Sequence, residues 1–335
     1  MRKPIVIAVP MAILLTLSGC ADDSGAPAGD AQAPEGDWPD ELTLYIPNPA
    51  GGGFDIAARA MQPQIADELG NEVVPVNQDG AGGAVAAEEM LSENADGTQM
   101  MIVSRTISSL PYTGTPELDP MVDLAPVGVT HRDVSALSVA AESEFDTVDD
   151  LIEHAEDNPG EVTVATVGEG GVWHSAGLIL EEAADVEFDF IPYEGGNEAG
   201  QAVSAGEVDA TTMGAPETEP FIENESLRML GVMDEERVEL FPDVPTLAEE
   251  GYDAEYVVWR GFVAPGDTPE AVLNELQDRI EQAVTEDATV EAMQDAGFDT
   301  TWEDAGDMQA LMEEEDELFP ELYDGSDVLV SEPER

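Results

Sequence analysis

Glycine-rich segments that join an apolar run to a helical pattern constrain the fold of this chain more than any other feature. Four of them occur, at residues 49–55 (PAGGGFD), 80–83 (GAGG), 167–171 (VGEGG) and 193–196 (YEGG). The apolar runs before them are typical of strands, and the segments after them carry apolar residues at helical spacing. Strands and helices that alternate in this way form parallel or mixed sheets covered by helices on both faces. We therefore expect an α/β fold.

The alternation continues along the chain after residue 40. We expect strands at residues 42–46, 73–76, 99–103, 162–166, 188–191, 210–213 and 228–233. We expect helices at residues 56–69, 84–91 and 147–156, and a mainly helical region at 269–323. Thr147, with Asp150 three positions later, has the pattern of a helix N-cap, and Gly70 is placed to end the first helix.

The chain is too long for one hydrophobic core. The roughly 295 residues beyond the first 40 lead us to expect two lobes, each a mixed sheet flanked by helices, with a ligand cleft between them. Extended runs mark the lobe boundaries, and we expect the chain to cross near residues 136–142 and 256–263. The expected lobes are therefore residues 40–140 with 256–335, and residues 141–255.

The N-terminus predicts export. Two basic residues precede an apolar stretch at residues 5–17, which is shorter than the roughly 20 residues that a bilayer-spanning helix needs and fits a signal peptide at residues 1–19. The stretch ends in LSGC, which resembles a bacterial lipoprotein box and predicts a lipid on Cys20, the only cysteine. Residues 20–40 are small, acidic and without apolar periodicity, which predicts a flexible tether. We expect a protein anchored to the outer face of the cell membrane.

The charge balance indicates a salt-rich environment. After removal of the signal peptide, eight arginines against 75 acidic residues leave a formal charge of −67. Such a surface repels itself at low salt, whereas the Debye length at molar salt is only about 3 Å. We interpret the chain as halophilic, and a nonspecific cation buffer is the alternative. The same charge excludes nucleic acid as a partner, because nucleic-acid binding depends on basic patches.

The glycine loops also predict where a ligand binds. Ligands of open α/β sheets lie outside the carboxyl ends of the strands, where such loops gather. Glycine lets the backbone approach the ligand, and a helix N-terminus offers unpaired N–H groups with partial positive charge. We therefore expect an anion site made chiefly of main chain, although tight turns alone would also explain each loop taken singly.

Several motifs in the same order make the sequence similar to a known family. They are IP followed by AGGGFDIAAR, VN with GAGG, PGEVTVATVGEGGVWHSAG, IPYEGG with GEVD, FPDVPTLAEEGY, and WRGFVAP. They cover residues 42–330 and resemble the solute receptors of tripartite tricarboxylate transporters, also called Bug receptors. The resemblance implies a two-lobed, type II-like periplasmic-binding fold and a small carboxylate held by loops of the first lobe and covered by the second. It also implies a large and a small integral membrane subunit as partners, no cofactor and no enzymatic activity.

Carried onto this chain, the motifs predict a set of ligand-binding residues. They are Ala50, Gly51, Gly52, Gly53, Phe54, Asp55, Gly82, Gly83, Arg105, Gly168, Gly170, Gly171, His174, Tyr193, Gly195 and Gly196. Arg105 is the candidate side-chain charge, with a surface ion pair as its alternative. For Asp55 we expect an N-cap bond to the N–H of Ala57 or Ala58, and for His174 either ligand contact or loop packing.

The sequence departs from the family pattern at three places. Gln78-Asp79 replaces a basic residue, Arg260 stands where an aromatic residue is common, and Asn197-Glu198 follows the paired glycines. The histidines lack metal-ligand spacing, so no metal is expected. A hydrolase using Ser175 or Ser204, a receptor that signals to a membrane kinase, and an acidic amino acid as ligand are the alternatives.

Overall fold

The computed structural model describes residues 41–115, 117–193, 195–238, 240–324 and 328–329. The predicted signal peptide, the lipid site at Cys20 and the tether lie outside the described residues. No helix in the described ranges is long and apolar enough to span a membrane.

One mixed sheet of six strands forms the first lobe. Its order is β11-β4-β10-β3-β1-β2, with β1 (Glu41–Ile46), β2 (Glu72–Asn77), β3 (Gln99–Ser104), β4 (Leu124–Val134), β10 (Val257–Pro265) and β11 (Thr300–Glu303). Strand β1 is parallel to β2 and β3, whereas β10 is antiparallel to β3 and β4. The helical segments of this lobe are α1 (Gly53–Leu69), η1 (Ala81–Gly83), α2 (Ala84–Ser92), α3 (Thr106–Thr113), α4 (Pro120–Asp123), α9 (Glu270–Thr285), α10 (Asp287–Asp295) and α11 (Ala305–Leu322).

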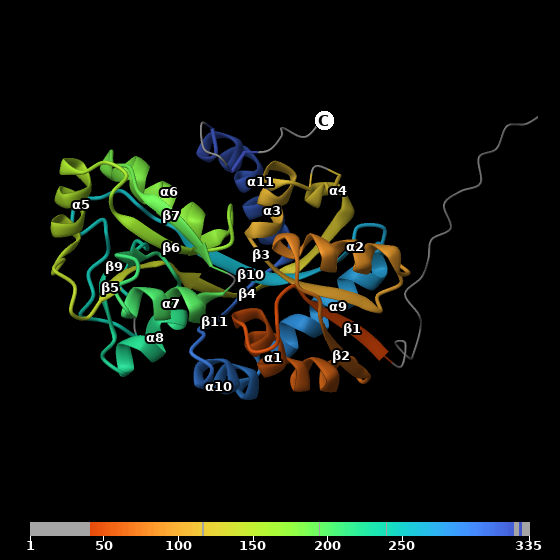
Figure 1. The fold of residues 1–335 in the computed structure, drawn as a ribbon. Helices are drawn as coiled ribbons and strands as arrows, with labels where there is room; N and C mark the ends of the chain where they lie inside the picture. The colour runs from red at the N-terminus through yellow and green to blue at the C-terminus, as the bar shows by residue number, and fades with distance from the viewer. Residues whose placement is uncertain (1–40, 116, 194, 239, 325–327, 330–335) are drawn as a thin grey trace, which may run out of the picture. The chain divides into compact units, whose positions relative to one another are not determined.

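A second mixed sheet has five strands. Its order is β7-β6-β8-β5-β9, with β5 (Ala136–Ala140), β6 (Thr163–Val167), β7 (Asp189–Tyr193), β8 (Ala210–Thr211) and β9 (Leu227–Val232). Its helices are α5 (Val148–Asp157), α6 (Val172–Ala184), α7 (Gly196–Ser204) and α8 (Ala215–Glu223). Two mixed sheets flanked by helices confirm the predicted α/β fold class (Figure 1).

The sheets are joined by β4 and β10, which run through the centre of Figure 1. Strand β4 ends at Val134 and β5 begins at Ala136, so Ser135 alone connects them. The chain thus crosses at Ser135, next to the expected crossing at residues 136–142, and residues 136–140, which were expected in the first lobe, belong to the second sheet. Hydrogen bonds fix this crossing, because Ser135 is bound by the residues that directly follow β8 and β9 of the second sheet. Its Oγ donates to the carbonyl oxygen of Thr212 at 2.6 Å, and its own carbonyl accepts from the N–H of Met233 at 2.8 Å.

Apolar side chains fill the space between each sheet and its helices. In the first lobe, Met61 and Ile65 of α1 pack with Leu276 of α9 in one buried cluster, and Met308 and Met312 of α11 belong to another. The second lobe has its own buried cluster, composed of residues from its strands and helices. Each sheet thus has a hydrophobic core of its own, which fixes the strand ends that carry the glycine loops.

Local signals in the sequence determine several helix ends. Gly70 ends α1 in the left-handed conformation, with φ of 71°, and donates its N–H to the carbonyl oxygen of Ala66. Thr147 and Asp150 form a reciprocal capping box at the start of α5. Both signals were predicted from sequence and are confirmed.

Candidate ligand-binding site

The four glycine segments lie at the carboxyl ends of adjacent parallel strands. Strands β1 and β2, which pair in parallel, lead into α1 and into η1 and α2. Strands β6 and β7, also a parallel pair, lead into α6 and α7. Each sheet therefore has two glycine loops at the carboxyl ends of its parallel strands. All four loops join a strand to a helix, as the sequence predicts.

Three of the helices that follow begin without a side-chain cap. Their N-cap residues are Gly52 for α1, Gly171 for α6 and Gly195 for α7, and none of these helices has a side-chain hydrogen bond at its cap. The first N–H groups of a helix have no partner within the helix, and the helix dipole makes them attractive to anions. The loops thus leave main-chain donors available to a ligand.

The first loop is held in shape by Asp55. This residue is 5% exposed, and its carboxylate accepts the N–H of Gly51 at 2.8 Å, Nε of Arg59 at 2.7 Å and Nδ2 of Asn77 at 3.0 Å. Burial favours a higher pKa for Asp55, but these hydrogen bonds and the charge of Arg59 outweigh it and hold the pKa below its usual value. The expected N-cap role is wrong, because Gly52 occupies the N-cap and Asp55 lies three positions further, where its carboxylate reaches back to Gly51.

The remaining residues of this loop lie just before and at the start of α1. Ala50 and Gly51 are exposed, and Gly51 has a φ of 85° that favours glycine. A Cβ on Gly52 would lie 2.2 Å from Oδ1 of Asn48, so a larger residue there would require the side chain of Asn48 to move. Phe54 lies under the guanidinium of Arg260, with 4.8 Å between its ring centroid and Cζ.

The second and fourth loops differ in how tightly they are packed. Gly82 and Gly83 have φ of 64° and 107°, and a Cβ on Gly83 would lie 3.3 Å from the side chain of Pro47. Gly195 has extended backbone, with φ of −163°, and open space around its Cα. Tyr193, the last residue of β7, is half-buried and accepts the N–H of Gly168 at 3.0 Å through its carbonyl oxygen.

His174 braces the third loop from inside. It is 7% exposed, and its Nδ1 accepts the N–H of Gly170 at 3.0 Å, which places its remaining proton on Nε2. Burial lowers the pKa of His174 to about 4, so the ring is neutral at ordinary pH. Its ring also packs on Phe190 at 4.5 Å between centroids. These contacts support the loop-packing interpretation of His174, and its contact with a ligand stays a prediction.

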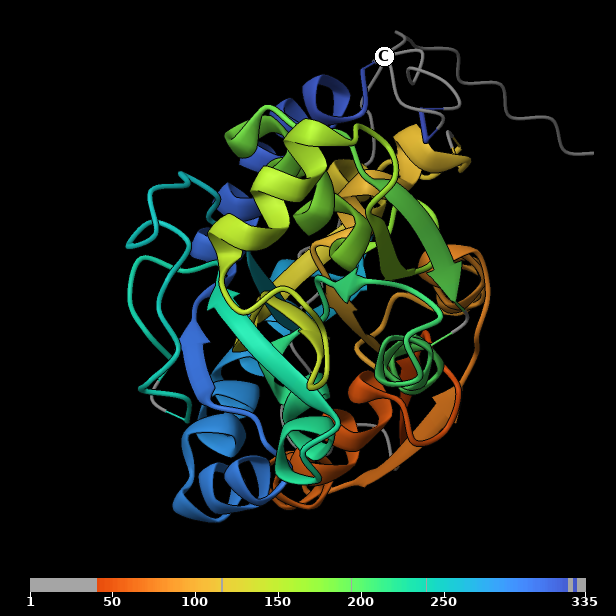
Figure 2. The ribbon, with the colours of Figure 1, turned by 60° about the vertical axis from the view of Figure 1, so that its left-hand side comes forward.

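Charged side chains from both lobes meet beside the first and fourth loops, and we call Asp133, Trp173, Glu217 and Arg260 the interlobe cluster. Nη2 of Arg260, on β10, lies 2.5 Å from Oδ2 of Asp133, on β4, and 3.4 Å from Oε1 of Glu217, on α8. Nε1 of Trp173, on α6, donates to Oε2 of Glu217 at 3.0 Å. The turned view of Figure 2 shows the red and orange start of α1 near green helices of the second lobe.

The interlobe cluster carries more negative than positive charge. Asp133 and Arg260 are 1% and 4% exposed. Burial raises the pKa of Asp133, and Arg260 opposes this rise. Burial also raises the pKa of Glu217, which Arg260 opposes and Asp133 reinforces. The guanidinium of Arg260 therefore faces two carboxylates, and it lies closer to that of Asp133 than to that of Glu217.

Arg105 is bound to other residues of the protein, outside the interlobe cluster. Its Nε lies 2.9 Å from Oε1 of Glu315 on α11, Nη1 donates to the carbonyl oxygen of Val257 at 2.9 Å, and its Cζ lies 3.9 Å above the ring of Tyr256. Contact between Arg105 and a ligand stays a prediction. All seven arginines among the described residues form ion pairs.

Sequence reasoning missed the interlobe cluster as a site. Arg260 was noted only as a departure from the family pattern, although a charged residue inside the apolar run WRGFVAP signals a buried partner. Glu217 and Asp133 gave no such signal, because acidic residues are abundant in every part of this chain.

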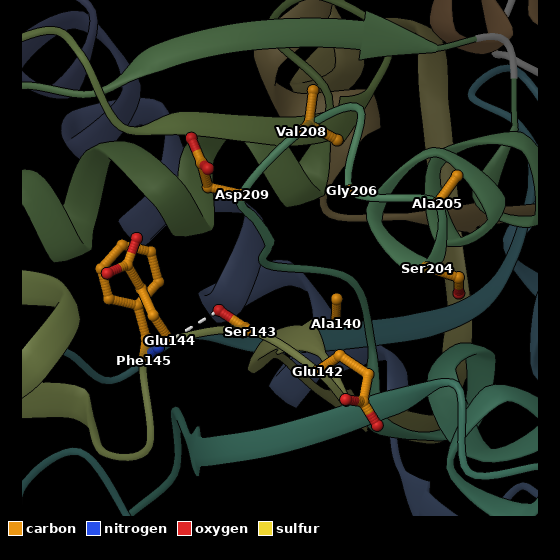
Figure 3. A pocket seen from close by; sticks show the side chains of 10 residues that line it. All are labelled: Ala140, Glu142, Ser143, Glu144, Phe145, Ser204, Ala205, Gly206, Val208 and Asp209. Carbon is orange, nitrogen blue, oxygen red and sulfur yellow. Dashed lines mark hydrogen bonds between the residues drawn. The ribbon is translucent and has the colours of Figure 1, made fainter.

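A separate pocket lies at the opposite end of the second sheet (Figure 3). Its volume is about 290 Å³, and its lining residues are Ala140, Glu142, Ser143, Glu144, Phe145, Ser204, Ala205, Gly206, Val208 and Asp209. Residues 204–209 precede β8, whereas the glycine loops follow β6 and β7, which run in the same direction as β8. The pocket lacks the uncapped helix starts of the loop region, and we do not assign the ligand to it.

The serines considered for hydrolysis have structural partners. Ser175 Oγ lies 2.8 Å from Oη of Tyr323, and it also bonds the carbonyl oxygen of Gly171. Ser204 Oγ donates to the carbonyl oxygen of Gly200, one turn earlier in its helix. Within the described residues, no group of three or more His, Cys, Asp and Glu side chains is arranged to hold a metal ion.

Two mixed sheets linked by crossing strands, with uncapped glycine loops at the strand ends, define a solute-binding protein of the periplasmic type. The chain belongs to the family described as "Tripartite tricarboxylate transporter family receptor", which it matches over residues 57–320. This finding confirms the resemblance seen in the sequence. The family is one of solute-binding receptors and is not an enzyme class.

Individual relatives agree with this assignment. The "UPF0065 protein in gbd 5'region" of Cupriavidus necator is 33% identical over 264 residues, which cover 78% of this chain and 80% of that protein. Protein BugT of Bordetella pertussis is 30% identical over 259 residues, which cover 75% of this chain and 78% of BugT.

Solved structures show the same architecture. A TctC solute binding protein from Polaromonas, solved without ligand, has a TM-score of 0.71 and 26% identity, covering 85% of this chain and 98% of its own. R. palustris Rpa4515, solved with adipate, has a TM-score of 0.79 and 26% identity, covering 86% and 98%.

Proposed function

We propose that this receptor captures a small carboxylate at the glycine loops and delivers it to a large and a small integral membrane subunit of a tripartite transporter. The observation that carries the proposal is the set of three uncapped helix starts at the strand ends of two sheets, at Gly52, Gly171 and Gly195. Main-chain N–H groups in such places are suited to carboxylate oxygens. The solved structure of Rpa4515 with adipate supports a carboxylate ligand by analogy.

The roles of side chains and main chain in the loops also support a carboxylate ligand, because side chains fix the loop shape and main-chain N–H groups face the ligand. Asp55 shapes the first loop and His174 the third, each through a hydrogen bond from a loop N–H. The ligand would then meet donors from the loops themselves, and no lysine is needed; the only lysine of the sequence is Lys3.

A thermal-shift screen tests the ligand class. Mono-, di- and tricarboxylates, acidic amino acids among them, are compared at molar salt with the amides of the same carbon chains, which keep the shape and remove the charge. A carboxylate at a hundredfold excess over its dissociation constant should add about 2.7 kcal/mol to the free energy of unfolding. Stabilisation by the amides or by cationic solutes, with none by carboxylates, would exclude an anion site.

We further propose that the mature protein is anchored through lipid on Cys20 and works in high salt, as the signal region and the acidic composition indicate. Two or three acyl chains anchor a protein stably, whereas one binds only marginally. Cys20→Ala should release the protein from membranes or block its processing. A variant that is processed normally and stays membrane-bound would contradict lipid anchoring at this residue.

A further inference from the structure

The carboxylate of Glu217 lies between two glycine loops of opposite lobes. A Cβ placed on Gly53, at the start of α1, would lie 3.3 Å from Oε1 of Glu217. A Cβ placed on Gly196, at the start of α7, would lie 3.0 Å from Oε2 of the same residue. A side chain of the second lobe thus places an anionic group against the first loop and the fourth loop at once.

Few interactions hold this carboxylate in place. Oε2 accepts one hydrogen bond from Trp173, and Oε1 lies 3.4 Å from Nη2 of Arg260, at the long limit of an ion pair. The side chain of Glu217 is 22% exposed, whereas that of Asp133, the stronger partner of Arg260, is 1% exposed. Asp133 is therefore a fixed part of the site, and Glu217 is the carboxylate that can leave.

Arg260 provides an independent sign that the site is built for an anion. Its side chain is 5% exposed, yet its Nε has no hydrogen-bond partner among the described residues. A buried guanidinium N–H without an acceptor is costly, and an incoming carboxylate would satisfy it. The guanidinium also borders the first loop, because a Cβ on Gly53 would lie 3.0 Å from its Nη1.

We propose that Glu217 is an internal carboxylate that occupies the anion site of the ligand-free receptor and is displaced by the carboxylate of the incoming ligand. This inference rests on the proposed function, and it identifies Glu217 as a residue that sets the affinity and the pH dependence of binding. Glu217 adds a second carboxylate beside Arg260, which is already paired with Asp133, and it also faces the starts of α1 and α7.

Displacement makes binding depend on protons. The charged groups that face Glu217 are Arg260, which favours its ionised form, and Asp133, which disfavours it. An ionised Glu217 is attracted to Arg260 and competes with the incoming carboxylate, whereas a protonated Glu217 is held less strongly and is displaced more easily. Carboxylate binding should therefore take up a proton, and the affinity should fall by up to about tenfold per pH unit as Glu217 ionises.

One test uses the side-chain fragment itself as the probe. Glu217→Ala removes the group that acetate resembles and leaves Arg260 paired with Asp133. Sodium acetate should raise the midpoint of thermal unfolding of Glu217→Ala by several degrees more than an equal concentration of sodium chloride. Wild type and Glu219→Ala, a substitution on the same helix, should respond equally to both salts. Equal responses of Glu217→Ala to acetate and chloride would overturn the proposal.

A second test measures adipate binding by calorimetry between pH 5 and pH 8. Glu217→Gln, which keeps the size and the hydrogen bond from Trp173, should bind adipate at least tenfold more tightly than wild type at pH 8. Its affinity should not depend on pH, whereas wild type and Glu219→Gln should weaken with rising pH and take up about one proton on binding. Equal, pH-independent binding by wild type and Glu217→Gln would refute the role of Glu217 and leave the proposed function intact. Binding by neither protein, with no shift by any carboxylate of the screen, would refute both.

Discussion

The glycines of the four loops have different reasons to be glycine. Gly51, Gly168 and Gly170 have φ of 85°, 69° and 70°, a region that costs other residues roughly 1–2 kcal/mol. Gly195 has φ of −163°, which any residue adopts, and nothing lies within 4 Å of its Cβ position. The fold therefore does not require glycine at residue 195. Ligand binding is the remaining reason for a glycine at this position.

Substitution of Gly195 separates the two reasons. Serine there should cap α7, raising the free energy of unfolding by a few tenths of a kcal/mol, because its hydroxyl accepts the N–H groups at the helix start. The same bond would withdraw those donors from a carboxylate, and we expect affinity to fall about tenfold, a change of roughly 1.4 kcal/mol. Calorimetry and thermal unfolding measure both effects. Gly168→Ala is the control, since it should lose stability through its φ. Unchanged affinity in Gly195→Ser would show that α7 does not contact the ligand.

Asp55 should govern the acid side of the stability profile. Its folded pKa lies below the usual value, so its contribution is complete above the unfolded pKa and is lost as pH falls through the folded pKa. Asp55→Asn should cost about 1–3 kcal/mol at pH 7, because the N–H of Gly51 and the amide of Asn77 lose a charged acceptor. Denaturant unfolding between pH 7 and pH 3 should show the difference between the proteins shrinking at acid pH. A constant difference would mean that the charge of Asp55 is not what matters.

Between elements, a buried polar link in the first lobe joins β10 and Arg105, the residue after β3, to α11. Glu315 is 3% exposed, is paired with Arg105 and accepts Nε1 of Trp259 at 2.7 Å. Burial raises the pKa of Glu315, and Arg105 and the hydrogen bonds oppose that rise. Removing one member of such a pair leaves a buried charge without compensation.

Single and double substitutions measure that link. Glu315→Ala should lower the free energy of unfolding by about 3–5 kcal/mol, because it leaves Arg105 buried and unpaired. The double variant Arg105→Met, Glu315→Met should recover most of that loss, since both charges are gone and apolar volume is restored. Denaturant unfolding of the three variants tests this, and a double variant as unstable as Glu315→Ala would show that packing dominates.

Elements defined by local signals could be predicted from the sequence. The capping box at Thr147 and the glycine at the end of α1 depend on a few neighbouring residues, and both were found. Strand β4 was missed because its second half, with His131, Arg132 and Asp133, breaks the apolar pattern of a buried strand. Burial of Asp133 depends on Arg260, more than a hundred residues away, and no local pattern carries that information.

The same distinction holds for the site. The glycine loops were predictable because a strand, a run of glycines and a helix follow one another in the chain. The interlobe cluster was not, since Trp173, Glu217 and Arg260 come from separate segments that only the folded chain brings together.

For the molecule as a whole, the excess of acidic residues is the dominant property. The seven described arginines are already paired, so the remaining carboxylates repel one another without internal compensation. Stability should rise steeply as salt screens this repulsion and then rise slowly or level off through ion exclusion. Thermal unfolding from 0.05 to 3 M salt measures the effect, and a flat midpoint would contradict the halophilic interpretation.

The single-residue crossing at Ser135 has a mechanical consequence. Its N–H, carbonyl and hydroxyl groups are bonded to Tyr256, Met233 and Thr212, and the residue is fully buried. A connection of one residue is too short to absorb a change in its backbone torsions, so a small torsional change at Ser135 rotates one sheet relative to the other. The interlobe cluster lies next to this connection, because Asp133 is two residues before Ser135 and is paired with Arg260, so the same torsional change would shift the first and fourth glycine loops relative to each other.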